Sequence, residues 1–150
     1  MTVSQIRAIR HAGIVVRDLE KSLMFYQDLL GLVLKARALE EGSFIADLLG
    51  LPDVRVETAK LSTPDGESQV ELLFFHNPSA TKLPHPTDFT SLGLTHLAFR
   101  VEGIDDLYQL LKDRGIRFIH PPTLSPNGRA TVAFCFDPEG NPLELVELHS

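Results

Sequence analysis

The sequence predicts an α+β protein made of two similar modules, each a βαβββ unit. Three observations support this fold class. A strand pattern that contains a histidine precedes an amphipathic helix near the start of the chain and again near residue 96. Each half ends in an apolar strand pattern that contains a glutamate, and a proline-rich segment separates the halves. Self-similarity of this kind restricts the fold more than any single element does.

The first module is expected at about residues 8–76 and opens with a strand over residues 8–16. An amphipathic helix follows, capped by Asp18 and ended by Gly31. Its apolar residues recur at helical spacing, and they are Leu19, Leu23, Tyr26 and Leu30. Tyr26 is expected to pack in the core.

Three more strands and a short connecting segment complete the first module. The sequence Pro64-Asp65-Gly66 is typical of a tight turn, and the strand before it alternates apolar with charged residues. The predicted order is a strand at 32–38, a short helix or irregular flap at 42–50, a strand at 54–61 and a strand at 69–75.

The second module is expected at about residues 92–149, after a linker at about 77–91 that contains three prolines. Apolar spacing and the terminal charges predict a helix at about 104–114, ended by Gly115. The predicted strands are 94–101, 117–119, 130–136 and 142–148, and the turn-forming residues at 137–141 predict a tight connection between the last two. Residues 1–150 are thus expected to form one domain of paired modules.

The composition is that of an ordinary globular protein. The chain has 150 residues, 43% hydrophobic and 23% charged, and a formal net charge of −6 with both signs interspersed, which argues against binding to nucleic acid or anionic membranes. No apolar run approaches the ~20 residues of a membrane span, and no signal pattern opens the chain. The single cysteine, Cys135, is expected to be a packed thiol, and the expected location is the cytoplasm.

Glu144 is an unusual residue for its place in the last strand. It lies between Leu143 and Leu145, and a polar group near a core without a partner costs on the order of 2 to 7 kcal/mol. Strand alternation offers a simple alternative, because it can turn Glu144 and Val146 together to an outer face. On this strand alone the two interpretations are equally good.

A second copy of the pattern favours a functional role. Glu71 lies in a similar apolar run, and each glutamate follows a strand that contains a histidine, His11 in the first half and His96 in the second. A lone histidine in a strand is more often structural than a ligand. Two histidines and two glutamates at matching places in a repeat indicate a shared site.

Four motifs then carry a resemblance to a known family. They are the phrase from His11 to Gly31 (HAGIVVRDLEKSLMFYQDLLG), Glu71, the phrase from Thr95 to Val101 (THLAFRV) and the phrase from Asp137 to Glu144 (DPEGNPLE). In this order they resemble the vicinal oxygen chelate superfamily, which includes glyoxalase I. The resemblance implies paired βαβββ modules whose curved sheets form a cup around a divalent metal. It implies that His11, Glu71, His96 and Glu144 are the metal ligands.

The chemistry of this ligand set agrees with the resemblance. Two neutral imidazoles and two carboxylates cancel the charge of a divalent ion, and the set suits Ni, Co, Fe, Mn or a Zn ion with more than four ligands. A Lewis acid of this kind stabilises an enediolate, so that a carboxylate can remove a neighbouring proton near neutral pH. We expect Glu144 to be the principal base and Glu71 to be a ligand or the opposite-face acid or base.

The substrate is less well defined than the ligands. Glutathione-using glyoxalase I commonly has Arg four residues after the first histidine and Asn four residues after the first glutamate, where this chain has Val15 and Phe75. The phrase DPEGN differs from the last motif of methylmalonyl-CoA epimerase. We therefore expect an isomerase or epimerase, acting on a small substrate such as a sugar-like ketone or an acyl-CoA, with glyoxalase I as an alternative.

Two further classes stay open. Extradiol dioxygenases and fosfomycin-modifying transferases of this superfamily leave the position of Glu71 free, so a glutamate there argues against them. Non-catalytic relatives that sequester an antibiotic usually lack the metal ligands.

Candidate substrate contacts are Phe44, Phe75 and Arg129, although core packing and a surface position are their simpler explanations. The remaining histidines are expected to be solvent-exposed, with His76 near enough to the Glu71 strand to touch a substrate, and they are His76, His85, His120 and His149. A homodimer is expected from the habit of the family, with the ligands drawn from one chain or two.

Overall fold

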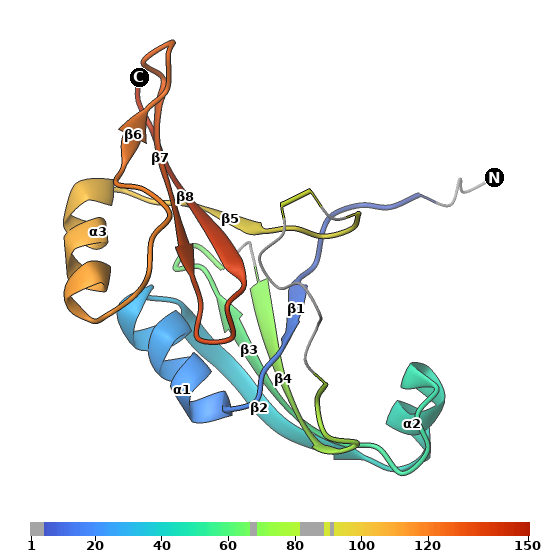
Figure 1. Cartoon of the computed structure of the whole chain (residues 1–150). Coiled ribbons are helices and arrows are strands. Elements are labelled where there is room, and N and C mark those ends of the chain that lie inside the picture. The colour runs from blue at the N-terminus through green and yellow to red at the C-terminus, as the bar shows by residue number, and fades with distance from the viewer. Residues whose placement is uncertain (1–4, 67–68, 82–88, 91) are drawn as a thin grey trace. The chain divides into compact units, whose positions relative to one another are not determined.

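The structure, a computed structural model, describes residues 5–66, 69–81, 89–90 and 92–150. The chain divides into two compact units, Met1–Thr81 and Lys82–Ser150, and each unit is described by itself (Figure 1). Much of the predicted linker, including His85, lies outside the described residues. In the described part of the chain, no helix is long and apolar enough to cross a membrane.

The first unit is a four-stranded mixed sheet with helices on it. Its strand order is β1-β4-β3-β2, with β1 parallel to β4 and the other pairs antiparallel. The elements in chain order are β1 (Ala12–Val15), α1 (Leu19–Leu23), the π-helix η1 (Met24–Leu29), β2 (Val33–Glu41), α2 (Ser43–Leu49), β3 (Arg55–Ser62) and β4 (Gln69–Asn77).

The predicted first helix is confirmed, with its second half wound as a π-helix. The Asp18 carboxylate accepts a hydrogen bond from the backbone N–H of Lys21 at 3.0 Å, as expected of an N-cap. Gly31, just after the helix, has a φ of 78°, a left-handed value that glycine adopts without a steric penalty. Tyr26 is fully buried, so the prediction that it packs in the core is confirmed.

An ion pair shows which face of the sheet α1 covers. Glu20 of α1 accepts a hydrogen bond at 2.6 Å from Arg37 of β2, and Arg37 is in register with Ala59, which is in register with Leu72. Residues directly paired across antiparallel strands point to the same side, so Leu72 faces the helix. Glu71, the next residue along β4, therefore points to the opposite face.

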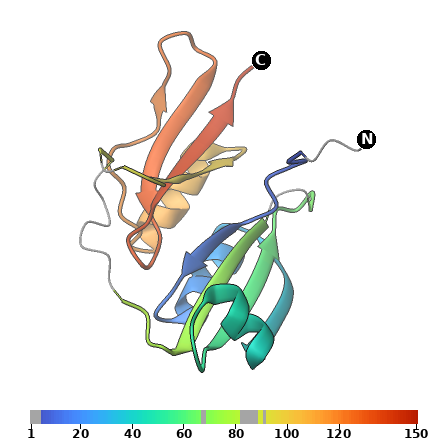
Figure 2. The same cartoon turned by 90° about the vertical axis from the view of Figure 1, so that its right-hand side faces the viewer.

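The segment at 42–50, predicted as a short helix or a flap, is the helix α2. Its residue Ile45 packs with Val54 and Val56, and Phe75 of β4 joins this cluster. Figure 2 shows α2 at one end of the sheet. The apolar cluster ties α2 to the face of the sheet that α1 leaves open.

The second unit repeats this plan. Its strand order is β5-β8-β7-β6, with β5 parallel to β8 and the other pairs antiparallel. The elements are β5 (Leu97–Arg100), α3 (Ile104–Asp113), β6 (Thr123–Leu124), β7 (Ala130–Phe136) and β8 (Pro142–Leu148). The α+β class and the two βαβββ modules are thus confirmed, with α2 as an addition in the first module.

One predicted strand is wrong. Residues 117–119 form no continuous strand but one isolated bridge, from Phe118 to Cys135 of β7. On either side of it, the Ile119 N–H donates to the Phe134 carbonyl and the Phe136 N–H donates to the Arg117 carbonyl. The strand in this region is β6, a few residues later. Pro121 and Pro122 lie between the two positions, and proline lacks the N–H that a continuous ladder needs.

The helix α3 starts at a glycine, and its cap comes from a distant strand. The Glu147 carboxylate of β8 accepts hydrogen bonds from the backbone N–H groups of Gly103 at 2.7 Å and Ile104 at 3.3 Å. These bonds lower the pKa of Glu147. The cap shows that α3 covers the face of β8 to which Glu147 points, which alternation assigns also to Leu143 and Leu145.

The apolar face under α3 holds the single cysteine. Cys135 is fully buried, as are Leu145 and Ala133, so the prediction of a packed thiol is confirmed. Burial raises the pKa of the Cys135 thiol to about 12, because a thiolate would lose its hydration there.

Candidate functional site

His11 and Glu71 form a close pair in the first unit. The His11 Nε2 atom lies 3.0 Å from the Glu71 Oε2 atom. The parallel pairing of β1 with β4 sets Gly13 opposite Glu71, and His11 is two residues before Gly13. The period of two in an extended chain therefore brings both side chains to the face opposite α1.

His96 and Glu144 form the equivalent pair in the second unit. The His96 Nε2 atom lies 3.2 Å from the Glu144 Oε2 atom. Ala98 of β5 is in register with Glu144 of β8, and His96 is two residues before Ala98. In both units the residue paired with the glutamate lies two positions after the histidine. The internal repeat therefore includes the relative positions of the histidine and the glutamate.

The location of Glu144 decides between the two interpretations of its strand. Leu143 and Leu145 are buried, whereas the Glu144 side chain is 24% exposed, on the other side of the strand. Alternation thus turns Glu144 away from the core, as the simpler interpretation has it. On that face the Glu144 side chain forms an ion pair with His96.

The surroundings of His96 include residues that sequence reasoning missed. The Thr95 Oγ1 atom lies 2.8 Å from the His96 Nδ1 atom. The rings of Phe89 and Phe134 pack against the imidazole, with centroid separations of 6.3 Å and 5.3 Å from it. Phe134 is in register with Glu144 across the β7–β8 hairpin.

The side chains of both pairs are partly exposed to solvent. The exposed fractions of the side chains are 37% for His11 and 13% for Glu71, and 34% for His96. Partly exposed donors of this kind can be reached by an ion or a substrate, while the strand backbone beneath fixes their spacing.

The donor atoms of each pair fit a divalent metal. Two ligand atoms that bind one ion at about 2.1 Å, with a right angle between the bonds, are about 3.0 Å apart. The separations of 3.0 Å and 3.2 Å in the two pairs are those of imidazole–carboxylate ion pairs, and they also suit this geometry. Within the residues described for either unit, no group of three or more His, Cys, Asp or Glu side chains is placed to hold a metal. Each unit contains one such His–Glu pair.

The predicted substrate contacts lie elsewhere in their units. Phe44 is an exposed residue of α2 (77% exposed), and Phe75 packs against the Ile45 cluster. The backbone N–H of Arg129 donates to the side chain of Asn127 at 3.0 Å, within the turn before β7. Their roles toward a substrate stay predictions.

The other described histidines have partners outside the two pairs. The His76 Nε2 atom lies 3.4 Å from Glu57, whose pKa is lowered mainly by its hydrogen bond with Arg37. His149 contacts the Thr131 hydroxyl at 2.7 Å. His76 and His149 are exposed as predicted, and His120 is half-buried.

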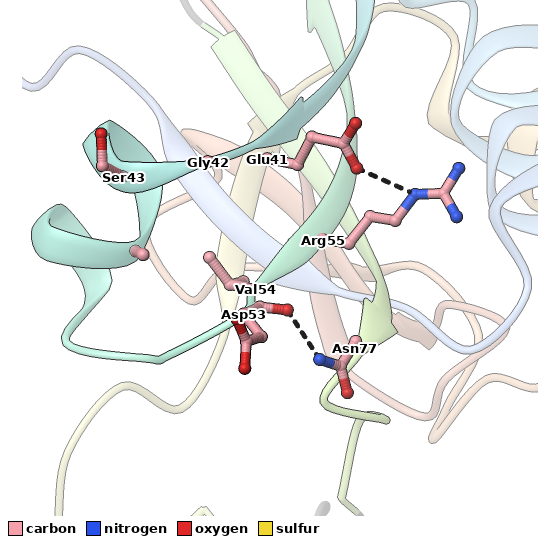
Figure 3. Close-up of a pocket in the computed structure, with 8 residues that line it drawn as sticks. Glu41, Gly42, Ser43, Asp53, Val54, Arg55 and Asn77 are labelled. Carbon is pink, nitrogen blue, oxygen red and sulfur yellow. Dashed lines mark hydrogen bonds and ion pairs between the residues drawn. The ribbon is translucent and has the colours of Figure 1, made fainter.

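The first unit also contains an open pocket of about 660 Å³ between α2, the start of β3 and the end of β4 (Figure 3). Its polar groups engage one another: Glu41 forms an ion pair with Arg55 at 3.3 Å, and the Asn77 amide donates to the Asp53 carbonyl at 2.6 Å. None of the four predicted ligands lines it. The paired imidazoles and carboxylates are therefore the stronger candidate for chemistry.

Comparisons with known proteins bear on the whole chain. The family model of the Glyoxalase/Bleomycin resistance protein/Dioxygenase superfamily matches residues 8–145. The chain is 31% identical to the uncharacterized protein YwkD of Bacillus subtilis (strain 168), over 95% of this chain and 98% of that protein. It is 30% identical to a lactoylglutathione lyase of Haemophilus influenzae, over 93% and 91%. A crystal structure of a glyoxalase family protein from Bacillus cereus matches with a TM-score of 0.91 and 27% identity, over 100% of this chain and 99% of that one.

Proposed function

The chain belongs to the glyoxalase/bleomycin resistance protein/dioxygenase superfamily, and from this premise we propose that it is a divalent-metal-dependent isomerase or epimerase. The proposed reaction moves a proton on the carbon next to a carbonyl or hydroxyl group of a small substrate. One observation carries the proposal, which is the recurrence of a His–Glu pair at the same register in both modules.

His11, Glu71, His96 and Glu144 are the residues that would hold the metal, because they are two imidazoles and two carboxylates with suitably spaced atoms. The metal, one of Zn, Ni, Co, Fe or Mn, would supply a Lewis acid that stabilises negative charge on a substrate oxygen. Removal of the adjacent proton then requires only a moderate base.

Glu144 is the proposed base. Its carboxylate is more exposed than that of Glu71, at 24% against 13%, so a substrate reaches it more readily. A Glu144 oxygen would take the proton from the substrate carbon and return it to the same or the neighbouring carbon. The rings of Phe89 and Phe134 beside His96 would limit the access of water to this step. Glu71 would serve as a ligand or as the acid or base on the opposite face.

A lactoylglutathione lyase is the second candidate, favoured by the relatives that carry this name at 30% and 28% identity. Two observations argue against a glutathione-using lyase. Val15 and Phe75 stand where the resemblance leads one to expect the Arg and Asn of glutathione-using enzymes, and Phe75 packs in the apolar cluster under α2. The same base chemistry would serve either reaction.

The test combines metal analysis with isotope exchange. Metal content is measured for the wild type, Glu144→Gln, His96→Ala and the control His76→Ala, which removes a histidine of the first unit bound to Glu57. Each protein is then incubated in deuterated water with hydroxyketones, the hemithioacetal of glutathione and methylmalonyl-CoA. We expect about one ion per site in the wild type and in His76→Ala, and loss of the ion in His96→Ala.

Deuterium uptake that depends on metal and is absent in Glu144→Gln would support the proposal, and the substrate that exchanges would distinguish an epimerase from the lyase. A wild-type protein that holds no divalent ion under any supply would refute it. A metal-loaded protein that exchanges no substrate proton would point to oxygenase or transferase chemistry.

Two finer expectations accompany this proposal. We expect a homodimer, which sedimentation analysis of the purified chain tests, and a cytoplasmic location. The net charge of −6 supports a small molecule rather than a nucleic acid as the partner.

A further inference from the structure

Lys60 of β3 lies beside Glu71. The two residues are directly paired across the antiparallel strands β3 and β4. Such pairs have their Cα atoms about 4.5 to 5.5 Å apart and point their side chains to the same side of the sheet. Lys60 therefore shares the face of the first unit on which His11 and Glu71 meet.

The lysine has no ion-pair partner in the described part of the chain. The paired carboxylate of Glu71 is engaged with His11 instead, at 3.0 Å. The Lys60 side chain is half-buried. A lysine in this position can lay its aliphatic stem along the sheet and keep its ammonium near the carboxylate of Glu71, where the charge is available to a bound anion.

The second unit shows that the fold does not need a lysine at this position. Phe134 holds the equivalent place, because it is the residue directly paired with Glu144. Its ring packs against His96 with a centroid separation of 5.3 Å. The residue paired with the glutamate can therefore be apolar, as in the second unit. In the first unit it is a lysine.

This lysine has an electrostatic consequence for the proposed site. A positive charge next to Glu71 repels a divalent cation and so weakens its binding. An anionic ligand group that lies between the Lys60 ammonium and the proposed metal ion would be attracted by both, so the repulsion between these two cations would be offset. Lys60 therefore raises the affinity of the site for anionic ligands relative to neutral ones.

We propose that Lys60 binds an anionic group of the substrate, a carboxylate or a phosphate, next to Glu71. This inference rests on the proposed function and narrows its substrate class to hydroxycarbonyl compounds that carry a negative charge. Lysine recognises such groups as a point charge through three donors, so it suits either anion.

The test uses three hydroxyketone probes that differ in charge: dihydroxyacetone, its phosphate and hydroxypyruvate. Calorimetry gives their dissociation constants with the metal-loaded wild type, Lys60→Met, Lys60→Arg and the control Lys35→Met, which removes an exposed lysine of β2. Loss of a hydrogen bond to a charged group typically costs a factor of about ten or more in affinity.

We expect Lys60→Met to bind one or both charged probes at least about tenfold more weakly and dihydroxyacetone as before. Lys60→Arg keeps most of the affinity, and Lys35→Met behaves as the wild type. A loss confined to dihydroxyacetone phosphate identifies a phosphate, and a loss confined to hydroxypyruvate identifies a carboxylate.

Metal content, measured first, separates this inference from the proposed function. Equal affinities in the wild type and Lys60→Met, or no binding of either charged probe to a metal-loaded protein, would overturn the role of Lys60 and leave the metal site standing. If the wild type holds no metal, the proposed function fails. Binding of inorganic phosphate to the metal-free wild type and to Lys60→Met then decides the role of Lys60 separately.

Discussion

Thr95 contacts the ring nitrogen of His96 that does not face Glu144. An imidazole Nε2 atom can bind a metal only when the ring proton is on Nδ1, and the Thr95 oxygen, 2.8 Å from Nδ1, can accept the hydrogen bond from that proton. The removal of such an outer partner typically lowers metal affinity about 10- to 100-fold.

We therefore expect Thr95→Val to weaken the binding of Zn²⁺ by about tenfold or more, measured by competition with a chelating dye. The control is Thr131→Val in the same unit, which removes a hydroxyl in contact with the Nε2 atom of His149 at 2.7 Å. Equal metal affinity in the two variants would show that Thr95 does not position His96.

Strand β8 illustrates how one element serves two purposes. Leu145 faces the core under α3 and is fully buried, whereas Val146, the next residue, shares the face of Glu144 and is only half-buried. Leu145→Ala removes buried methyl groups and leaves a cavity, which typically costs about 2 to 5 kcal/mol.

We expect Leu145→Ala to lower the free energy of unfolding by about this amount in urea denaturation and Val146→Ala to lower it by less than half as much. Similar losses in the two variants would contradict the division of β8 into a core face and a ligand face.

The cap of α3 makes the stability of the second unit depend on pH. Hydrogen bonds from Gly103 and Ile104 lower the pKa of Glu147 in the folded protein. A carboxyl whose pKa is lower in the folded state adds stability above its ordinary pKa and loses this contribution as the pH falls through the folded pKa.

Glu147→Gln should therefore lower the melting temperature at pH 7, and its difference from the wild type should shrink as the pH falls below the ordinary glutamate range. Calorimetric melting between pH 7 and pH 3 measures this, with the exposed Glu102→Gln as the control for loss of one charge. A difference that stays constant with pH would contradict the assigned cap.

At the scale of the whole molecule, each module carries one His–Glu pair, and the proposed function takes both pairs as ligands of one metal ion. A ligand that binds only the folded protein raises its stability by mass action, by about 2.7 kcal/mol at a free concentration of 100 times the dissociation constant.

We expect Zn²⁺ or Ni²⁺ to raise the melting temperature of the wild type and a chelator to reverse the rise. His11→Ala and His96→Ala should each abolish most of the rise, although the two histidines belong to different units, whereas His76→Ala should retain it. A full rise in either of the first two variants would mean that one module binds the metal alone.

Most of the architecture was predictable from local patterns. The helical spacing after Asp18, the glycines that end the helices and the turn at 137–141 depend on near neighbours in the chain, and each is found where it was expected. The strand predicted at 117–119 is wrong because a strand exists only if a partner ladder continues, and the two prolines that follow interrupt it.

The sequence by itself determined the α+β class and the two βαβββ modules, because hydrophobic period and repeated motifs are local properties of the chain. The four candidate ligands follow from the resemblance of its motifs to the superfamily. The tertiary structure decided which residues surround each pair. Phe134 beside Glu144, Lys60 beside Glu71 and Glu147 at the start of α3 owe their places to strand pairing and to the packing of α3 on β8. Register joins residues far apart in sequence through backbone hydrogen bonds between strands, so the pattern within one strand does not show which residue of another strand lies opposite.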